Sequence, residues 1–197
     1  MKVAVIGATG NAGQRIVTEL RARGHDVTRI ARGIDDGDGV AVDATDTAAL
    51  AEALRGHDAV VSSVKFKFFD TQLLIDAVRA SGVSRYVVVG GAGTLWFAPG
   101  VREGERPDFP EMAKEEVGKG ARFLGQLREV EDLDWTFLSP SREFVPGERT
   151  GKFRTGKDDL LFWAEGRSGI SYEDYAIAIA DELEHPAHVR TRFTVGY

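Results

Sequence analysis

The chain begins with the stretch Lys2-Val-Ala-Val-Ile-Gly-Ala-Thr-Gly-Asn-Ala-Gly13, a short apolar, mostly β-branched run that leads into glycines at positions 7, 10 and 13. A helical pattern follows over residues 14–23. This order predicts a strand, a phosphate-binding loop and a helix whose free N–H groups and positive dipole end face an anion. Gly7 would allow a sharp turn off the strand, Gly10 a close approach of backbone to phosphate, and Gly13 close packing of the helix. We expect a nucleotide site here rather than a Gly-rich turn with a purely structural role.

The overall composition favours a protein that binds small molecules. The 197 residues carry a net charge of −6, and basic residues do not cluster, which argues against nucleic acid or an anionic membrane as the main partner. Cysteine is absent, which excludes disulfides and thiolate metal sites and gives no sign of an oxidising compartment. Apolar runs fall far short of the ~20 residues that span a bilayer, and a strand that starts at residue 2 leaves no room for a signal peptide. We expect a soluble, cytoplasmic protein.

The rest of the chain alternates between predicted strands and helices. Strands are expected at residues 26–31, 40–42, 58–64, 85–89 and 135–138, and helices at residues 46–54, 69–81 and 111–131. Short connections between such elements require right-handed crossovers and a parallel sheet that is covered on both faces. We predict a Rossmann-like, doubly wound α/β fold, as a single NAD(P)-binding domain over residues 1–197 with a small C-terminal region on the substrate side.

Less regular segments lie in the second half of the chain. Residues 94–109 predict a loop long enough to be functional, residues 153–163 a hairpin or small strand pair, and residues 188–195 a final strand. The sequence Ser171-Tyr-Glu-Asp174 predicts a capping box, with Ser171 as N-cap and Asp174 as the reciprocal acid of the helix that follows.

The end of the second predicted strand bears on the choice of dinucleotide. An NAD site usually carries an acidic residue about 20 residues past the glycines, whereas an arginine accommodates the 2′-phosphate of NADP. This chain reads Arg29-Ile-Ala-Arg32, and the next carboxylate is Asp35. Because a guanidinium matches phosphate geometry, Arg32, with Arg29 as second candidate, predicts NADP(H) over NAD(H). The alternative is a solvated arginine at a strand end. Asp43 is expected either to accept from the adenine amino group or to be a plain loop acid.

Several segments resemble the atypical short-chain dehydrogenase/reductases, in their NAD(P)H-binding, flavin-reductase-like branch. The matching pieces, spread over nearly the whole chain, are residues 7–13, 42–44, 82–93, 133–140 and 170–176. Residues 90–94 and 147–150 look most like the bacterial NADH-flavin reductase subgroup. The resemblance implies contacts along the whole cofactor. At the adenosine end it places Asp43 and Ala44 at adenine and Arg32 at the 2′-phosphate, and it places Thr9, Gly10 and Ala12 at the pyrophosphate. At the other end it places Ser62, Ser63 and Val64 beside ribose and nicotinamide, and Pro140 and Ser141 at the carboxamide. Asn11 and Gly91 complete the predicted cofactor-binding set.

The chain departs from catalytic short-chain reductases in one respect. These enzymes use Tyr-x-x-x-Lys, in which the lysine lowers the pKa of the tyrosine so that it can exchange a proton with a substrate oxygen. None of the four tyrosines has a lysine four residues on, and Met112 occupies the region where a family tyrosine is expected. Redox chemistry of alcohols or ketones by this dyad is therefore not expected, and no catalytic residue is assigned.

Two functions from different classes stay open at this point. The first is an NADPH-dependent reductase of FMN, FAD or another conjugated acceptor, because hydride transfer to a flavin leaves an anion that solvent can protonate. The second is a non-catalytic NADP(H)-binding redox sensor that reports to a partner protein. An epimerase or dehydratase would need an acid–base pair that the sequence does not reveal. The oligomeric state, including a homo-oligomer, is left open.

The acceptor is expected at the carboxyl ends of the parallel strands. There Thr94 would hydrogen-bond the acceptor, Trp96 would stack on its ring, and Arg142 would meet an anionic group. The alternative for Trp96 is to fill the gap under the long helix. The aromatic residues Phe66, Phe68, Phe69, Trp96 and Phe97 are expected to be core, ordinary surface or part of a planar-ligand pocket. The histidines are predicted to lie in turns or in solvent, so we expect no metal site.

Overall fold

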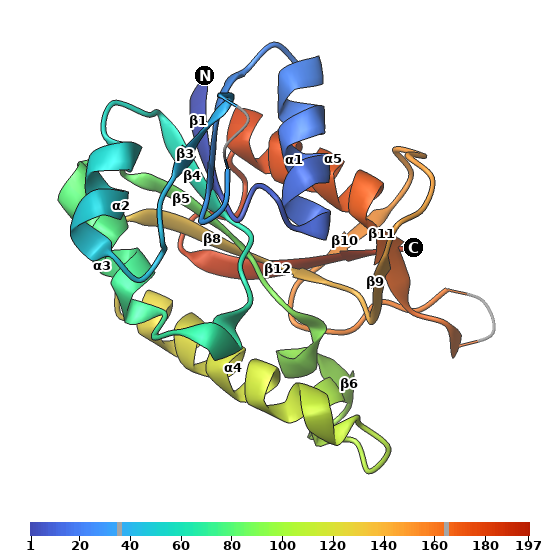
Figure 1. Ribbon diagram of the computed structural model, residues 1–197. Coiled ribbons are helices and arrows are strands. Elements are labelled where there is room, and N and C mark those ends of the chain that lie inside the picture. The colour runs from blue at the N-terminus through green and yellow to red at the C-terminus, as the bar shows by residue number, and fades with distance from the viewer. Residues whose placement is uncertain (35–36, 164–165) are drawn as a thin grey trace.

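The computed structural model describes residues 1–34, 37–163 and 166–197, and these residues form an eight-stranded sheet with the order β10-β12-β8-β5-β4-β1-β2-β3 (Figure 1). Adjacent strands are parallel except β10, which runs antiparallel to β12. The predicted Rossmann-like, doubly wound sheet is therefore confirmed. The strands are β1 (Lys2–Ile6), β2 (Asp26–Ala31), β3 (Gly39–Ala41), β4 (Ala59–Ser62), β5 (Arg85–Val89), β8 (Asp134–Pro140), β10 (Arg154–Gly156) and β12 (Thr191–Gly196).

Helices cover both faces of the sheet. Helices α1 (Asn11–Ala22) and α5 (Tyr172–Glu184) lie on one face, and α2 (Thr47–Leu54), α3 (Gln72–Ser81) and α4 (Lys114–Arg128) lie on the other (Figure 1). Each face has its own buried cluster, one with Leu20 and Ile179 and the other with Leu50, Ile75 and Phe123. Strand β4 is buried along its whole length, as both-sided coverage of a parallel sheet requires. No described helix is long and apolar enough to cross a membrane.

The strand order reverses between β1 and β4. From β1 the chain builds outward through β2 and β3, and it then crosses back to place β4 on the opposite side of β1 before it continues to β5 and β8. In open α/β sheets, the loops at the carboxyl ends of the strands diverge at such a point and leave a crevice. The loops that follow β1, β4 and β8 therefore surround the region where a ligand is expected.

Helix starts follow the predicted signals, with one correction. Helix α2 begins after Asp46, whose side chain accepts a hydrogen bond from Ala49 N. Helix α5 begins after Ser171, whose hydroxyl accepts from Asp174 N at 3.0 Å. The reciprocal half of the predicted capping box is wrong, because the N–H of Ser171 donates to the hydroxyl of Tyr197 instead. The Asp174 carboxylate accepts from Thr150, Gly151 and Tyr197.

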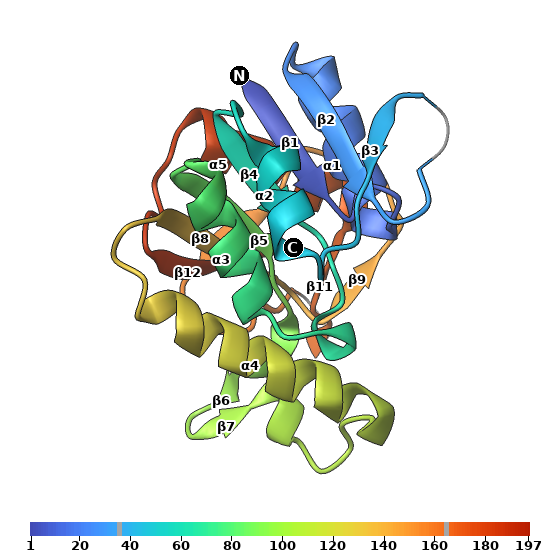
Figure 2. The same cartoon turned by 60° about the vertical axis from the view of Figure 1, so that its left-hand side comes forward.

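Some segments differ from the prediction. Residues 94–109 are more regular than a loop, because β6 (Trp96–Ala98) and β7 (Val101–Arg102) form a small antiparallel hairpin beside α4 (Figure 2). The hairpin predicted over residues 153–163 is wrong, since β10 pairs with β12 at the sheet edge. A further pair, β9 (Glu143–Val145) with β11 (Gly169–Ser171), was not predicted. Asp35 lies outside the described residues.

Candidate dinucleotide site

A groove follows the carboxyl edge of the sheet and consists of two halves of about 430 Å³ each. The β2-side half lies over the ends of β1 and β2 and is lined by residues 6, 7, 9, 31–33, 42–45, 68 and 69. The β8-side half lies over the ends of β5 and β8 and extends to η2 (Ala92–Thr94) and the start of α4. Gly10, Ser63, Val64 and Lys65 line both halves. The groove is therefore continuous across the switch point between β1 and β4.

The three glycines of the first loop have different structural roles. Gly7 has a φ of +78°, and a Cβ on it would lie 2.1 Å from the carbonyl oxygen of Ser63. A Cβ on Gly13 would lie 2.2 Å from the carbonyl oxygen of Gly7. These two positions exclude a side chain because protein backbone occupies the space. A Cβ on Gly10 would lie 3.3 Å from the Gly7 carbonyl oxygen, a tight contact but without the overlap found at Gly7 and Gly13, and Gly10 itself lines both halves of the groove.

The first turn of α1 is well suited to an anion. Among the described residues no side chain caps this end of the helix, and its first turn contains no acidic residue. The first intrahelical bond, from Gln14 N to Gly10 O at 2.9 Å, leaves the preceding N–H groups of the turn for another acceptor. Asn11 and Ala12 line the β8-side half, next to Gly10. The residues present thus fit the phosphates of a nucleotide.

Arg32 and Asp43 both line the β2-side half, together with Ala44 and Thr9. Hydrogen bonds from the backbone and hydroxyl of Thr45, together with the nearby Arg32 charge, hold the pKa of Asp43 below its usual value. Asp43 is therefore an ionised hydrogen-bond acceptor at neutral pH.

The β8-side half is largely apolar around a few polar groups. Five of the residues predicted for the cofactor or acceptor line it: Gly91, Thr94, Pro140, Ser141 and Arg142. The Thr94 hydroxyl accepts from Arg192 at 2.8 Å. The Ser141 hydroxyl points toward Gly196 of β12, so closely that a Cβ added to Gly196 would lie 2.2 Å from the hydroxyl oxygen.

The Arg142 guanidinium already has a protein partner. Its Nε and one Nη donate to the two carboxylate oxygens of Glu103 at 2.7 and 2.9 Å. Glu103 also lines the groove, although it is only 3% exposed. This bidentate pair raises the pKa of Arg142 and fixes the plane of its guanidinium. A ligand in the groove could therefore bind only the N–H groups of Arg142 that do not donate to Glu103.

Four predicted site residues lie outside the set of described residues that line the groove. Gly13 packs against the loop, as given above. Ser62 is buried, and its hydroxyl lies 2.9 Å from that of Tyr86. Arg29 bonds to Asp38, and Trp96 packs under the guanidinium of Arg102, 4.1 Å from the ring centroid. Trp96 thus braces the β6–β7 hairpin.

The aromatic residues divide between core and groove. Phe66 is 4% exposed, stacks on Phe137 and meets Phe123 edge-on, yet it borders the β8-side half. Phe68, which is 65% exposed, and Phe69 line the β2-side half. Lys65, Glu103, Phe109, Phe144 and Tyr172 also line the groove, although no motif in the sequence points to them. Sequence patterns could not identify them, because they come from separate segments that only the folded chain brings to one edge of the sheet.

Tyr172 is the one tyrosine that lines the groove among the described residues, and its sequence context lacks the lysine of Tyr-x-x-x-Lys. Tyr172 lines the β8-side half, packed edge-on against Phe144 with ring centroids 4.5 Å apart, and the residue four positions on is Ala176. Burial raises the pKa of both Tyr86 and Tyr175. Among the described residues, no group of three His, Asp or Glu side chains could hold a metal ion.

Comparisons with known proteins agree with this geometry. A sequence profile for NAD(P)H-binding proteins matches residues 7–186. The uncharacterised protein YwnB of Bacillus subtilis is 40% identical over 209 residues, covering 99% of this chain and 98% of YwnB. A candidate epimerase from Bacteroides thetaiotaomicron is 38% identical with a TM-score of 0.92, over 100% of this chain and 96% of that one. A candidate NADH-flavin reductase from Streptococcus pneumoniae is 35% identical with a TM-score of 0.86, over 100% and 99% of the two chains.

Proposed function

The chain belongs to the NAD(P)H-binding protein family, and we propose that it is an NADPH-dependent reductase of a flavin or a similar planar acceptor. The observation that carries this proposal is the continuous groove, with the glycine loop at its centre, Arg32 in one half and mostly apolar walls in the other. Such a groove suits a dinucleotide that lies across the switch point, with adenosine in the β2-side half and nicotinamide in the β8-side half.

In this proposal, bound NADPH supplies a hydride. Gly10 and the uncapped first turn of α1 hold the pyrophosphate, Arg32 binds the 2′-phosphate, and Asp43 accepts from the adenine amino group. The β8-side residues Pro140 and Val64 bound the nicotinamide. The relative named as an NADH-flavin reductase supports a flavin as acceptor.

The side chains of the β8-side half favour orientation over acid–base catalysis. The apolar groups of Phe109, Val117 and Phe66 line the space beside the strand ends, where they would pack against a flat ring and exclude water. A flavin that accepts a hydride takes its balancing proton from solvent, so the reaction yields reduced flavin and NADP⁺ without a protein acid. The missing Tyr–Lys dyad is consistent with this chemistry.

A redox sensor that binds NADP(H) without turnover is the alternative. The observation in its favour is Met112, which occupies the expected place of the dyad tyrosine and is 87% exposed. Fluorescence of bound NADPH, followed with and without FMN, FAD and quinones, separates the two functions. Oxidation that depends on an acceptor supports the reductase, and saturable binding without oxidation by any of these acceptors supports the sensor. Absence of binding to both NADPH and NADH would contradict both.

The acceptor site can be tested with a matched pair of variants. Arg142→Ala removes a groove residue, and we expect it to raise the acceptor KM by about tenfold through loss of a charged hydrogen bond. Trp96→Ala removes a side chain that lies outside the groove, and we expect a lower Tm but an unchanged KM per folded molecule. Steady-state kinetics and thermal melting measure both. A KM that rises only in Trp96→Ala would show that the acceptor lies at the hairpin instead.

We also propose a cytoplasmic location, a small-molecule acceptor and no nucleic-acid partner. These follow from the acidic, cysteine-free composition. Cell fractionation tests the location.

A further inference from the structure

Lys65 occupies an unusual place in the groove. It is the only basic residue among those described that lines both halves, whereas Arg32 lines the β2-side half alone and Arg142 the β8-side half alone. Lys65 is exposed, and its ammonium makes no hydrogen bond or ion pair with any other described residue. Arg142, by contrast, is neutralised by Glu103. A lysine without an ion-pair partner among the described residues therefore lies where the two halves meet.

The backbone that carries Lys65 is firmly held. Lys65 directly precedes η1 (Phe66–Phe68), and the Glu116 carboxylate of α4 accepts from Phe66 N at 2.9 Å and from Lys67 N at 3.0 Å. The ring of Phe66 is buried in the aromatic core. The base of the Lys65 side chain is thus fixed, while its ammonium stays available to a ligand in the groove.

We propose that Lys65 binds the pyrophosphate of the dinucleotide and so contributes equally to NADPH and NADH affinity. This inference rests on the proposed dinucleotide site. A dinucleotide that fills both halves must place its pyrophosphate, which joins the two nucleotides, where the halves meet, and Gly10 lies at the same junction. A lysine ammonium binds phosphate as a point charge and needs no bidentate geometry.

The position of Lys65 also separates its role from that of Arg32. Arg32 lies beyond the junction, beside Asp43 and Ala44, so it discriminates between cofactors with and without a 2′-phosphate. Lys65 contacts a group that NADPH, NADH and ADP-ribose share. Adenosine 2′-monophosphate has the 2′-phosphate but no pyrophosphate, so it should respond to Arg32 and not to Lys65.

Calorimetric titration of four ligands against a small set of variants tests this assignment. For Lys65→Gln we expect the dissociation constants of NADPH, NADH and ADP-ribose to rise together by about tenfold, as for the loss of one charged hydrogen bond. Adenosine 2′-monophosphate should bind Lys65→Gln as it binds wild type, and Arg32→Ala more weakly. Lys65→Arg should restore most of the affinity. Lys67→Gln is the matched control, because Lys67 lies two residues on, over the Phe68 ring, and outside the residues that line the groove.

Other outcomes overturn the inference in distinct ways. Unchanged dinucleotide affinity in Lys65→Gln would remove Lys65 from the site, although binding to wild type would leave the proposed function intact. Weaker binding of adenosine 2′-monophosphate to Lys65→Gln would show that Lys65 contacts the 2′-phosphate and not the pyrophosphate. An equal loss in Lys67→Gln would show a general electrostatic effect, not a contact. If wild type binds neither NADPH nor NADH, the proposed function itself fails.

Discussion

Gly10 lines both halves of the groove, and a Cβ there would approach the Gly7 carbonyl oxygen closely, at 3.3 Å, without overlapping it. We expect Gly10→Val to abolish dinucleotide binding, because the valine would occupy the space proposed for phosphate, while the free energy of unfolding falls by only about 1 kcal/mol from a poorer N-cap. Calorimetry and thermal melting measure the two effects. Gly13→Val is the contrasting variant, since its Cβ would strike the Gly7 carbonyl and destabilise the fold itself. A Gly10→Val protein that still binds NADPH would show that this glycine serves packing alone.

Arg32 is the residue on which the preference for NADPH depends. We expect Arg32→Ala to weaken NADPH binding by about tenfold or more and to leave NADH binding unchanged, because only NADPH carries the 2′-phosphate that a guanidinium would bind. Arg29→Ala is the control, since Arg29 bonds to Asp38 outside the groove. An equal loss of NADPH and NADH affinity in Arg32→Ala would contradict the assignment of Arg32 to the 2′-phosphate.

At the scale of elements, a buried ion pair holds α5 to the sheet. Glu182 of α5 is 3.0 Å from Arg85 of β5, with side chains 3% and 9% exposed, and it also accepts from Thr136 and His188. Burial lowers the pKa of Arg85, while Glu182 opposes this change. Removing only the carboxylate would leave an uncompensated buried charge.

We therefore expect Glu182→Ala to lower the free energy of unfolding by about 3–5 kcal/mol. Glu184→Ala, at the partly exposed end of the same helix, should cost only about 1 kcal/mol or less. Urea unfolding at neutral pH compares the two variants. Similar small losses in both would mean that the apolar packing of α5, and not the ion pair, keeps the helix in place.

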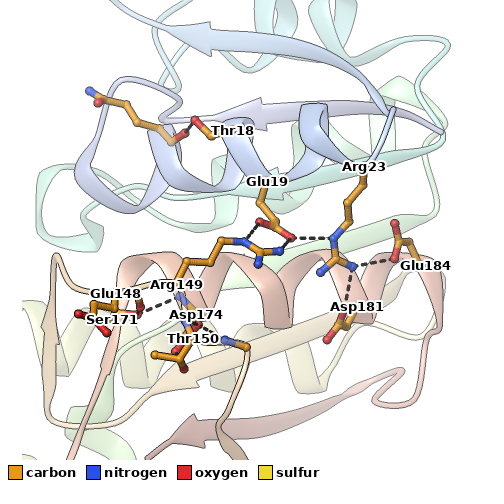
Figure 3. Close-up of polar contacts among 12 residues, drawn as sticks. Thr18, Glu19, Arg23, Glu148, Arg149, Thr150, Ser171, Asp174, Asp181 and Glu184 are labelled. Atoms are coloured by element: carbon orange, nitrogen blue, oxygen red, sulfur yellow. Dashed lines mark hydrogen bonds and ion pairs between the residues drawn. The ribbon is translucent and has the colours of Figure 1, made fainter.

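At the scale of the whole molecule, Glu19 joins three segments that are distant in the sequence (Figure 3). The Glu19 carboxylate of α1 accepts from Arg149 and from Arg23, and Arg23 also pairs with Asp181 and Glu184 of α5. The segment that carries Arg149 is tied to the start of α5 by Ser171 and Asp174. This network lies next to the α1–α5 packing on the same face of the sheet.

The pKa of Glu19 predicts how stability depends on pH. Hydrogen bonds from Arg149, opposed by burial and aided by Arg23, lower this pKa below its usual value in the folded state. A carboxyl with a depressed folded pKa contributes stability above its unfolded pKa and loses it as pH falls through the folded value. We expect Glu19→Gln to cost about 1–2 kcal/mol at pH 7 and to flatten the loss of stability below about pH 4.5. Glu148→Gln, with an exposed side chain, is the control; parallel pH curves for wild type and Glu19→Gln would contradict the prediction.

The local pattern of the sequence determined much of the architecture. Strands 26–31 and 85–89, the Asp46 and Ser171 caps and the sharp turn at Gly7 follow from neighbours in the chain, because turn conformation, capping and apolar runs act over a few residues. The glycine loop and Arg32 could be found for the same reason.

Only the tertiary structure decided which side chains share the groove. Lys65 follows β4, Glu103 follows the β6–β7 hairpin and Tyr172 begins α5, and these three line the same half of the groove because separate loops and small sheets gather over the carboxyl edge of the main sheet. Tertiary packing also placed two of the predicted residues outside the groove lining, because Ser62 faces the core and Trp96 packs under Arg102. A side chain's partners across the sheet depend on strand order and face, which the sequence does not encode locally.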